Sequence, residues 1–295
     1  MTIEVAVQQL INALSLGSLY ALLALGLGMV YSVLGMLNFA YGELLTVCGY
    51  TMFLLILIGV PFPVAGLVGL GMAIGVSLLI ERLVFRPLRG ASFISLLFAS
   101  FAASVIIQNL IKQLISKRPK VIPVPEVFDQ MINIGPFQIN VLSLIILLVG
   151  LVTLAGLVAF LQKTRWGLAI RAAAEDFEVT RLMGAKANRV IALSFALSGF
   201  VAGVAGVLWL SRRGAVSPTM GFIPILKAFI AIVIGGLGSL KGAVMGGFLL
   251  AFIEVALMVM LPTRAVPFTD AFALMIVVVI LYMRPEGLIS IKTGS

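Results

Sequence analysis

Histidine is absent from the 295-residue sequence, and Cys48 is its single cysteine. The absence of histidine removes the commonest general base, the commonest metal ligand and the usual pH-sensitive switch. A lone cysteine excludes an internal disulfide, and without histidine it leaves no residues at zinc-binding spacing. We therefore expect neither a metal centre nor histidine-dependent catalysis in this chain.

Charge is scarce as well. Only 11% of the residues are charged, 62% are hydrophobic, and the mean hydropathy is +1.22. A soluble domain is nearer half apolar and about a quarter charged, so composition excludes a soluble protein. The net charge of +9 does not indicate nucleic-acid binding, because the basic residues lie in short loops between apolar runs. The composition predicts a polytopic membrane protein in contact with lipid.

The apolar runs predict an all-α transmembrane bundle of about eight or nine membrane segments, forming one domain over residues 1–295. Helices are expected at about 9–33, 44–59, 64–81, 92–111, 140–161, 191–210, 223–237, 242–260 and 269–283. The segment 223–237 is short and ends in a glycine-rich run, so whether it crosses the membrane stays open. Close helix packing is expected at the small-residue pairs Gly71/Gly75, Gly199/Gly203 and Gly242/Gly246, because small residues let membrane helices approach.

Orientation follows from the basic residues, which are enriched in cytoplasmic loops. If residues 162–189 are cytoplasmic, twelve basic residues lie inside and seven outside. The C-terminus is then cytoplasmic, and the side of the N-terminus depends on whether every segment crosses.

The first apolar stretch is interrupted by the segment Gly35-Met36-Leu37-Asn38-Phe39-Ala40-Tyr41-Gly42-Glu43. Helices break inside membranes where the backbone lines a cavity, so we predict that Asn38, Tyr41, Gly42 and Glu43 lie on a substrate pathway. An equally simple interpretation of Glu43 is a helix-start acid, favoured by the positive helix N-terminus.

Glu254, about twelve residues into the helix 242–260, is a further candidate for the pathway, because acids inside membrane helices are costly and usually functional. The simpler interpretation, which we favour, is a buried acid paired with a polar neighbour such as Lys227. Gln108 and Asn109 are expected to form hydrogen bonds between helices.

No soluble-enzyme motif is found. The nearest approach to a phosphate-binding Walker loop is Gly238-Ser239-Leu240-Lys241-Gly242, which has the wrong order and spacing. A nucleophile elbow, Gly-x-Ser-x-Gly, is absent. If the protein does work, the energy must come from an ion gradient or from another chain.

The longest polar stretch, residues 162–189, contains an amphipathic helical element at 165–184. Glu175 and Asp176 begin a second short helix, where acids suit the helix dipole, and Gly184 is a candidate C-cap. The Ala172-Ala173-Ala174 surface, Phe177 and Met183 have no obvious core to enter. A solvated loop helix is the simplest interpretation, but an exposed apolar patch on such an element indicates a partner.

Five segments together resemble the membrane permease subunit of bacterial ABC importers for branched-chain amino acids. They are Leu16–Leu22, Gly35–Glu43, Glu81–Arg89, Gly167–Gly184 and Gly235–Ser239. Tyr41 is a departure, since the family commonly has histidine at this position. Urea and amide importers share the same scaffold and remain an alternative.

The resemblance implies two permease subunits forming the path, two separate ATPase subunits that bind ATP, and a periplasmic binding protein, all at the inner membrane. This chain would then hold no cofactor of its own. The resemblance also makes the 165–184 element the segment that couples to the ATPase, through Arg171, Ala172, Ala173, Glu175, Asp176, Phe177 and Gly184. An ion-coupled secondary transporter is the main alternative of another class. The small number of acids in the membrane segments counts against it. An intramembrane enzyme is disfavoured by the missing motifs.

Overall fold

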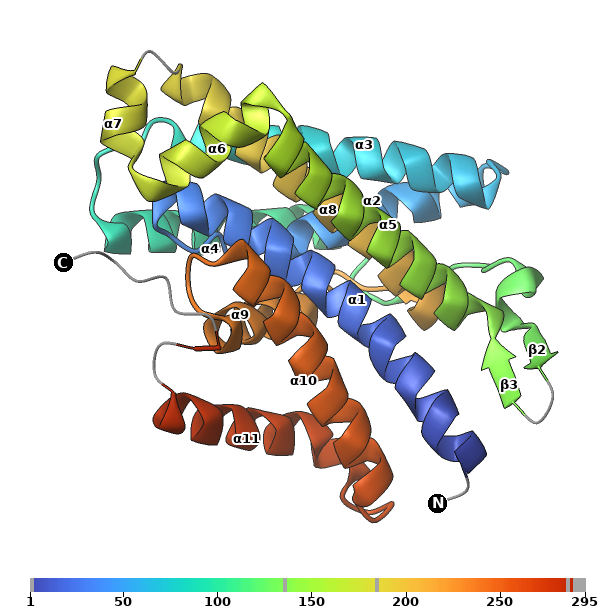
Figure 1. Cartoon of the computed structure of the whole chain (residues 1–295). Coiled ribbons are helices and arrows are strands. Elements are labelled where there is room, and N and C mark those ends of the chain that lie inside the picture. The colour runs from blue at the N-terminus through green and yellow to red at the C-terminus, as the bar shows by residue number, and fades with distance from the viewer. Residues whose placement is uncertain (1–2, 135–136, 184–185, 285–286, 289–295) are drawn as a thin grey trace. The chain divides into compact units, whose positions relative to one another are not determined.

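A computed structural model describes residues 3–134, 137–183, 186–284 and 287–288, which are almost entirely helical (Figure 1). The helices are α1 (Ile3–Leu34), α2 (Tyr41–Leu57), α3 (Phe62–Ile80), α4 (Phe93–Leu114), α5 (Val141–Lys163), α6 (Arg165–Glu175), α7 (Phe177–Leu182), α8 (Ala187–Arg213), α9 (Phe222–Gly235), α10 (Leu240–Met260) and α11 (Thr269–Met283). Two short helical turns, η2 (Glu126–Asp129) and η3 (Val266–Phe268), lie in connections.

Each apolar run that predicted a membrane helix has a counterpart, so the chain is an all-α, multi-pass membrane protein. Seven helices of the described chain are long and apolar enough to span a membrane, and α2 and α9 are shorter apolar helices. The 14 residues of α9 extend about 21 Å at 1.5 Å per residue. This length is well below the roughly 30 Å of a hydrocarbon core, which favours a segment that does not cross alone.

The chain forms two compact units that are interleaved along the sequence. Unit 1 comprises residues 1–28, 126–152 and 226–295, and unit 2 comprises residues 29–125 and 153–225. Helices α1, α5 and α9 each contribute residues to both units. That the whole chain acts as one transmembrane domain stays a prediction.

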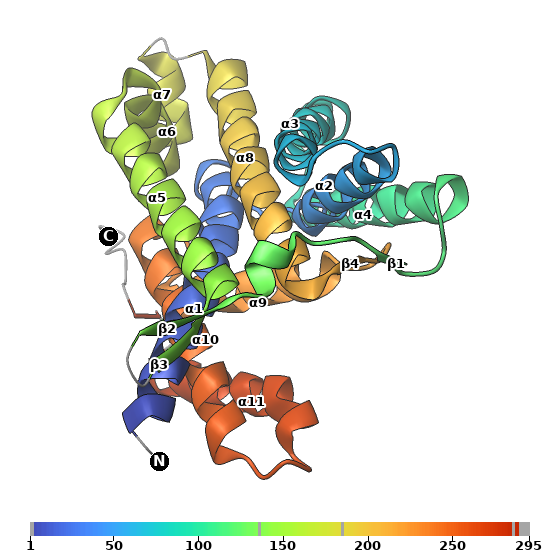
Figure 2. The same cartoon turned by 90° about the vertical axis from the view of Figure 1, so that its right-hand side faces the viewer.

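In unit 2, α2, α3 and α8 pack together as neighbours (Figure 2). Close approach of α8 to α3 depends on Gly203, where an added Cβ would lie 2.9 Å from the Leu70 backbone. Gly199 packs against α3 in the same way, which confirms one predicted small-residue pair. Among the described residues, nothing lies within 4 Å of a Cβ built on Gly71 or Gly75, so the close packing predicted at this pair is not found within the chain.

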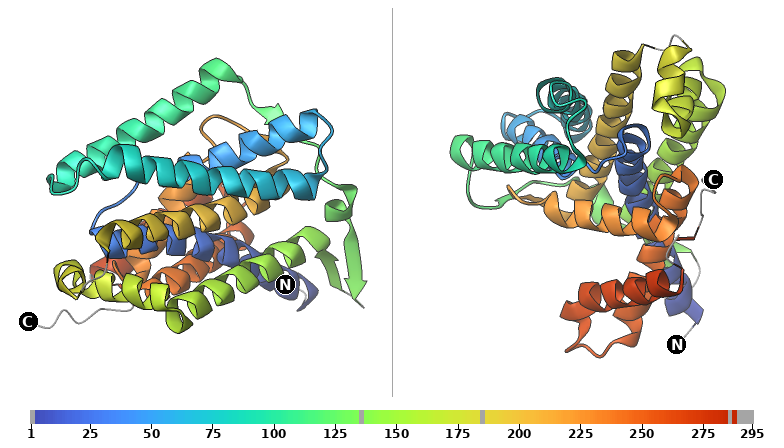
Figure 3. Two further views of the ribbon diagram at one scale, coloured as in Figure 1. Left: turned by 90° about the horizontal axis from the view of Figure 1, so that it is seen from above. Right: turned by 90° about the vertical axis from the view of Figure 1, so that its left-hand side faces the viewer.

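A π-helical turn, η1 (Glu81–Phe85), ends α3 and begins the bend that leads to α4. Figure 3 shows α3 and α4 meeting at this bend and spreading apart from it. Phe85 is buried there, with its ring 5.2 Å from that of Phe195 on α8. The Ser77 hydroxyl donates to the Phe195 carbonyl at 2.6 Å. The bend and the end of α3 therefore contact the N-terminal half of α8 through ring packing and a hydrogen bond.

In unit 1, the first part of α1 lies against α10. An added Cβ at Gly247 of α10 would lie 2.5 Å from the Ala21 backbone nitrogen, so only glycine allows this approach. Ser18 donates to the carbonyl of Ile146 on α5 at 3.4 Å. Helix α11 packs against α10. Small residues on α1 and α10 therefore set the packing of this unit, as the sequence predicts.

The strands are short. In unit 1, β2 (Met131–Ile134) pairs antiparallel with β3 (Phe137–Asn140). In unit 2, β1 (Lys120–Val121) pairs antiparallel with β4 (Ala215–Val216). The prolines and charges of residues 112–138 predicted a loop, and these small pairings were not expected.

Candidate functional site

The break between α1 and α2 is present where the sequence predicts it. Helix α1 ends at Leu34, and Gly35 adopts φ +66°, which glycine tolerates without strain. Asn38 is 2% exposed, and its side-chain oxygen accepts a hydrogen bond from the Ala40 amide at 3.0 Å. The Phe39 amide donates to the Ser100 hydroxyl of α4 at 3.2 Å. The open backbone of the break is thus satisfied partly by its own turn and partly by α4.

Glu43 lies in the first turn of α2 and is 1% exposed. Its Oε1 accepts hydrogen bonds from the Gln108 side-chain amide at 2.7 Å and the Ser104 hydroxyl at 2.9 Å. Oε2 has no hydrogen bond of regular geometry, although Thr46 is a polar neighbour one turn along α2. Within unit 2, no described cation forms an ion pair with this carboxylate. Glu43 is therefore a buried acid held by neutral donors, which goes beyond the helix-start interpretation.

The donors to Glu43 belong to a polar stripe on α4, formed by Ser100, Ser104 and Gln108. These residues are spaced four apart, so they lie on one face of the helix. The stripe faces both the break and the start of α2, through the contacts at Phe39 and Glu43. The predicted interhelical bond of Gln108 is confirmed. Asn109 instead donates to the Val105 carbonyl of its own helix, so the prediction for Asn109 is wrong.

Tyr41 and Gly42 lie at the start of α2, just after the break. Tyr41 is fully buried, and its hydroxyl has no hydrogen-bond partner among the described residues. An added Cβ at Gly42 would lie 2.5 Å from the carbonyl oxygen of Gly221. Gly42 therefore packs against backbone, which corrects the prediction that it lines a cavity at the break. Its place on a pathway stays a prediction.

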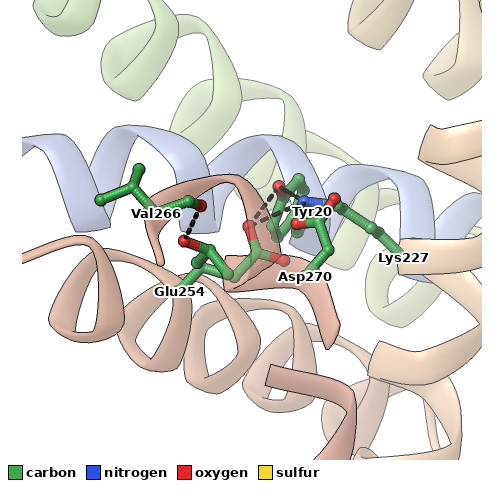
Figure 4. A network of polar contacts seen from close by, with 6 residues as sticks. Tyr20, Lys227, Glu254, Val266 and Asp270 are labelled. Carbon is green, nitrogen blue, oxygen red and sulfur yellow. Dashed lines mark hydrogen bonds and ion pairs between the residues drawn. The ribbon is translucent and has the colours of Figure 1, made fainter. Parts of the chain in front are cut away.

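Glu254 lies in a charged network in unit 1, drawn in Figure 4. Lys227 Nζ donates to Glu254 Oε2 at 2.8 Å, to the Tyr20 hydroxyl at 2.8 Å and to Asp270 Oδ1 at 3.1 Å. The Tyr20 hydroxyl donates to Glu254 Oε2 at 2.8 Å. The predicted pairing of Glu254 with Lys227 is confirmed. Because the charge of Glu254 is matched inside the chain, a stabilising role explains it fully, and a pathway role stays only a prediction.

Sequence reasoning missed two members of this network. Tyr20 on α1 and Asp270 at the start of α11 lie 207 and 43 residues from Lys227. Nothing in the local pattern around either residue predicts this contact. Helical spacing does not connect positions on different helices, so only the fold brings them together.

The 165–184 element forms two short helices, α6 and α7. Ala173 is 3% exposed and faces inward with Gly167 and Ile170, contrary to the expectation that the three alanines form an open surface. Arg171, Glu175 and Asp176 are exposed, whereas Ala172 and Phe177 are half-buried. Gly184 lies outside the described residues. The predicted role of these residues in coupling is not tested by their positions.

The exposed apolar surface of this element lies elsewhere. Leu168 is 59% exposed, Leu182 is 81% exposed and Met183 is 84% exposed. We call these three residues the apolar patch. Leu182 and Met183 lie on the apolar side that the sequence predicts for the second short helix, whereas the exposure of Leu168 is evident only once the inward face of α6 is known.

Arg89 joins the start of α8 to the bend after α3. Its guanidinium donates to the buried carboxylate of Glu81 in η1 and to the side-chain oxygen of Asn188, the second residue of α8.

Among the described residues, no group of three or more His, Cys, Asp or Glu side chains could hold a metal ion.

The helical fold, with seven helices of the described chain long and apolar enough to cross a membrane, defines a polytopic membrane protein. The family model described as "Branched-chain amino acid transport system / permease component" matches residues 9–282. The chain belongs to this permease family.

Full-length relatives support the assignment. The chain is 34% identical to the high-affinity branched-chain amino acid transport system permease protein BraD of Pseudomonas aeruginosa, over 96% of this chain and 95% of that protein. It is 33% identical to the corresponding protein LivH of Escherichia coli K12, over 96% and 94%. A probable LivH of Methanocaldococcus jannaschii is 30% identical, over 94% and 90%. No solved structure was found to match the chain.

Proposed function

We propose that this chain is the membrane permease subunit of an ATP-driven importer for branched-chain amino acids in the inner (cytoplasmic) membrane. The observation that carries the proposal is the match to a branched-chain amino acid permease family over residues 9–282. Similarity at about one third identity extends over nearly the whole of both chains. It is therefore not confined to one apolar helix, where composition alone would produce matches.

The assembly would contain a second permease subunit, two ATPase subunits and a periplasmic binding protein. The family description itself denotes one component of a transport system. Since the sequence has no phosphate-binding loop, ATP would be bound by the partner subunits, and this chain would hold no cofactor.

The apolar patch is the surface that the ATPase would cover. Helix α6 packs against α8, and Arg89 joins the start of α8 to the bend after α3, so a force on α6 would reach both. Burying exposed apolar surface is worth about 25 cal/mol per Å². Residues 162–189 and the ATPase would lie on the cytoplasmic side.

The test is reconstitution of the complex in vesicles with its binding protein, followed by uptake of leucine, isoleucine, valine and urea. We expect uptake of the amino acids only with ATP and both kinds of partner subunit. Uptake of urea without the amino acids would favour the amide alternative, and uptake driven by an ion gradient alone would contradict an ATP-driven importer.

The coupling role is tested by Leu182→Asp and Met183→Asp. Both side chains are more than four-fifths exposed, so we expect normal insertion, weaker retention of the ATPase and at least about tenfold lower uptake. The control is Arg118→Glu in the 112–138 loop, which should transport normally. Normal assembly and uptake by both Asp variants would leave α6 and α7 as solvated loop helices.

A further inference from the structure

We infer that Glu43, with Ser104 and Gln108, binds the α-ammonium group of the amino acid in transit. This inference rests on the proposed function, because it names the part of the substrate that this site of unit 2 would contact. It assigns one chemical group, a primary ammonium, to one carboxylate oxygen, Glu43 Oε2.

The first step in the argument is the unmatched charge. An isolated buried carboxylate is costly unless a cation accompanies it. Glu43 is 1% exposed, and its Oε1 accepts hydrogen bonds from two neutral donors, Ser104 and Gln108. Lys112, one turn beyond Gln108 on α4, forms no ion pair with Glu43.

The second step is the free acceptor. A carboxylate offers about four lone-pair positions, and Oε2 receives no hydrogen bond of regular geometry. Gln108 and Ser104 fix the orientation of the carboxylate through its other oxygen. An ammonium group has three donors and one positive charge. It would therefore supply both a hydrogen bond to Oε2 and a counter-charge for the carboxylate.

The third step concerns two other cations that could neutralise Glu43, a metal ion and a proton. A bound calcium ion takes six to eight oxygen ligands, and the described residues contain no group of three acidic or metal-ligating side chains. A permanently bound proton would make Glu43 equivalent to glutamine. The experiment below separates that case from an ammonium site.

The position agrees with transport. The stripe Ser100–Ser104–Gln108 joins the Glu43 carboxylate to the break between α1 and α2. Irregular backbone is tolerated at membrane depth where it is buried in protein or lines a water-filled cavity. A substrate held at Glu43 would therefore lie beside the part of unit 2 whose backbone is not committed to a continuous helix.

The experiment uses the complete complex in vesicles with liganded binding protein, and it measures leucine uptake and ATP hydrolysis in the same preparation. For Glu43→Gln we expect uptake to fall about 10- to 100-fold, which corresponds to the loss of a charge-assisted hydrogen bond. ATP hydrolysis stimulated by the binding protein should stay within about twofold, because the ATPase contacts are unchanged. The thermal unfolding midpoint should not fall, since the substitution removes an unmatched buried charge.

A second variant, Glu43→Asp, keeps the charge but shortens the side chain by one methylene, and we expect it to recover part of the uptake. Asn109→Leu is the control, because the Asn109 side chain is exposed and bonds only within its own helix. It should leave complex yield, stability and uptake at the wild-type level.

The outcomes separate cleanly. Wild-type uptake by Glu43→Gln would overturn the inference and indicate a protonated acid. A proportional fall of uptake and ATP hydrolysis in Glu43→Gln, or an assembled Glu43→Asp complex as inactive as Glu43→Gln, would indicate a structural role instead. If the wild-type complex itself fails to take up branched-chain amino acids, the proposed function fails, whatever the variants do.

Discussion

Two buried glutamates of this permease, one in each unit, differ in how their charge is accommodated. In unit 1, Glu254 meets Lys227 and Tyr20, and all three polar groups are joined by hydrogen bonds (Figure 4). In unit 2, Glu43 is held on one oxygen by Ser104 and Gln108, without a cation. A buried charge with its counter-charge stabilises the fold, whereas a buried charge without one is available to bind a group that the chain does not supply.

This contrast is sharpened most by removing the cation of unit 1. Lys227→Met leaves Glu254 buried without its partner, and breaking a buried pair in this way costs about 3–5 kcal/mol. We expect a large loss of stability, measured as complex yield and thermal unfolding midpoint in detergent. The double variant Lys227→Met with Glu254→Gln should recover most of that loss. If Lys227→Met alone is as stable as the wild type, the network of unit 1 does not stabilise the fold.

A smaller effect is expected at the neutral donors of unit 2. Gln108→Leu removes the shorter of the two hydrogen bonds to Glu43 and should cost about 1–3 kcal/mol. The neighbouring variant Asn109→Leu is the matched control, because the Asn109 side chain is exposed and bonds only within its own helix. It should change stability by less than about 0.5 kcal/mol. Equal effects at both positions would contradict a specific role of Gln108.

The smallest effect is expected at Asp270, the outer acid of the unit 1 network. Its side chain is 62% exposed, and exposed ion pairs contribute about 0–1 kcal/mol. Asp270→Asn should therefore leave the unfolding midpoint nearly unchanged at 0.15 M salt. A loss as large as that of Lys227→Met would show that Lys227 depends on both acids, and would make the Glu254 pair weaker than its geometry indicates.

The sequence predicts this fold well for a physical reason. A membrane helix must form its backbone hydrogen bonds internally and needs about 20 apolar residues. The local sequence therefore determines whether a helix exists and roughly where it begins and ends. The break at residues 35–40 is local too, since Gly35 ends α1 with a positive φ. The sites are less predictable, because they depend on which helix faces come together. Glu43 was identified as a candidate, but its donors Ser104 and Gln108 lie 61 and 65 residues away.

The same limit explains the misplaced surface on α6. Three consecutive alanines look like an open contact face, yet Ala173 is turned inward and is 3% exposed. Consecutive residues on a helix point in different directions, so a run of three cannot form one face. Because Ala173 is buried, a bulky charge there would disturb folding as well as docking. Leu182 and Met183 therefore offer a cleaner test of ATPase contact.

The long sequence separation within the unit 1 network affects the order in which the protein can fold. The Tyr20–Lys227–Glu254 network joins the first helix to two of the last three, across 207 and 234 residues. During synthesis α1 is made long before α9 and α10. The Tyr20 hydroxyl therefore cannot bond with Lys227 or Glu254 until most of the chain has been made. Closing such a distant contact comes late and leaves unfinished chains exposed to misassembly. A chain that ended between α9 and α10 would carry Lys227 without the glutamate that pairs with it in the complete protein.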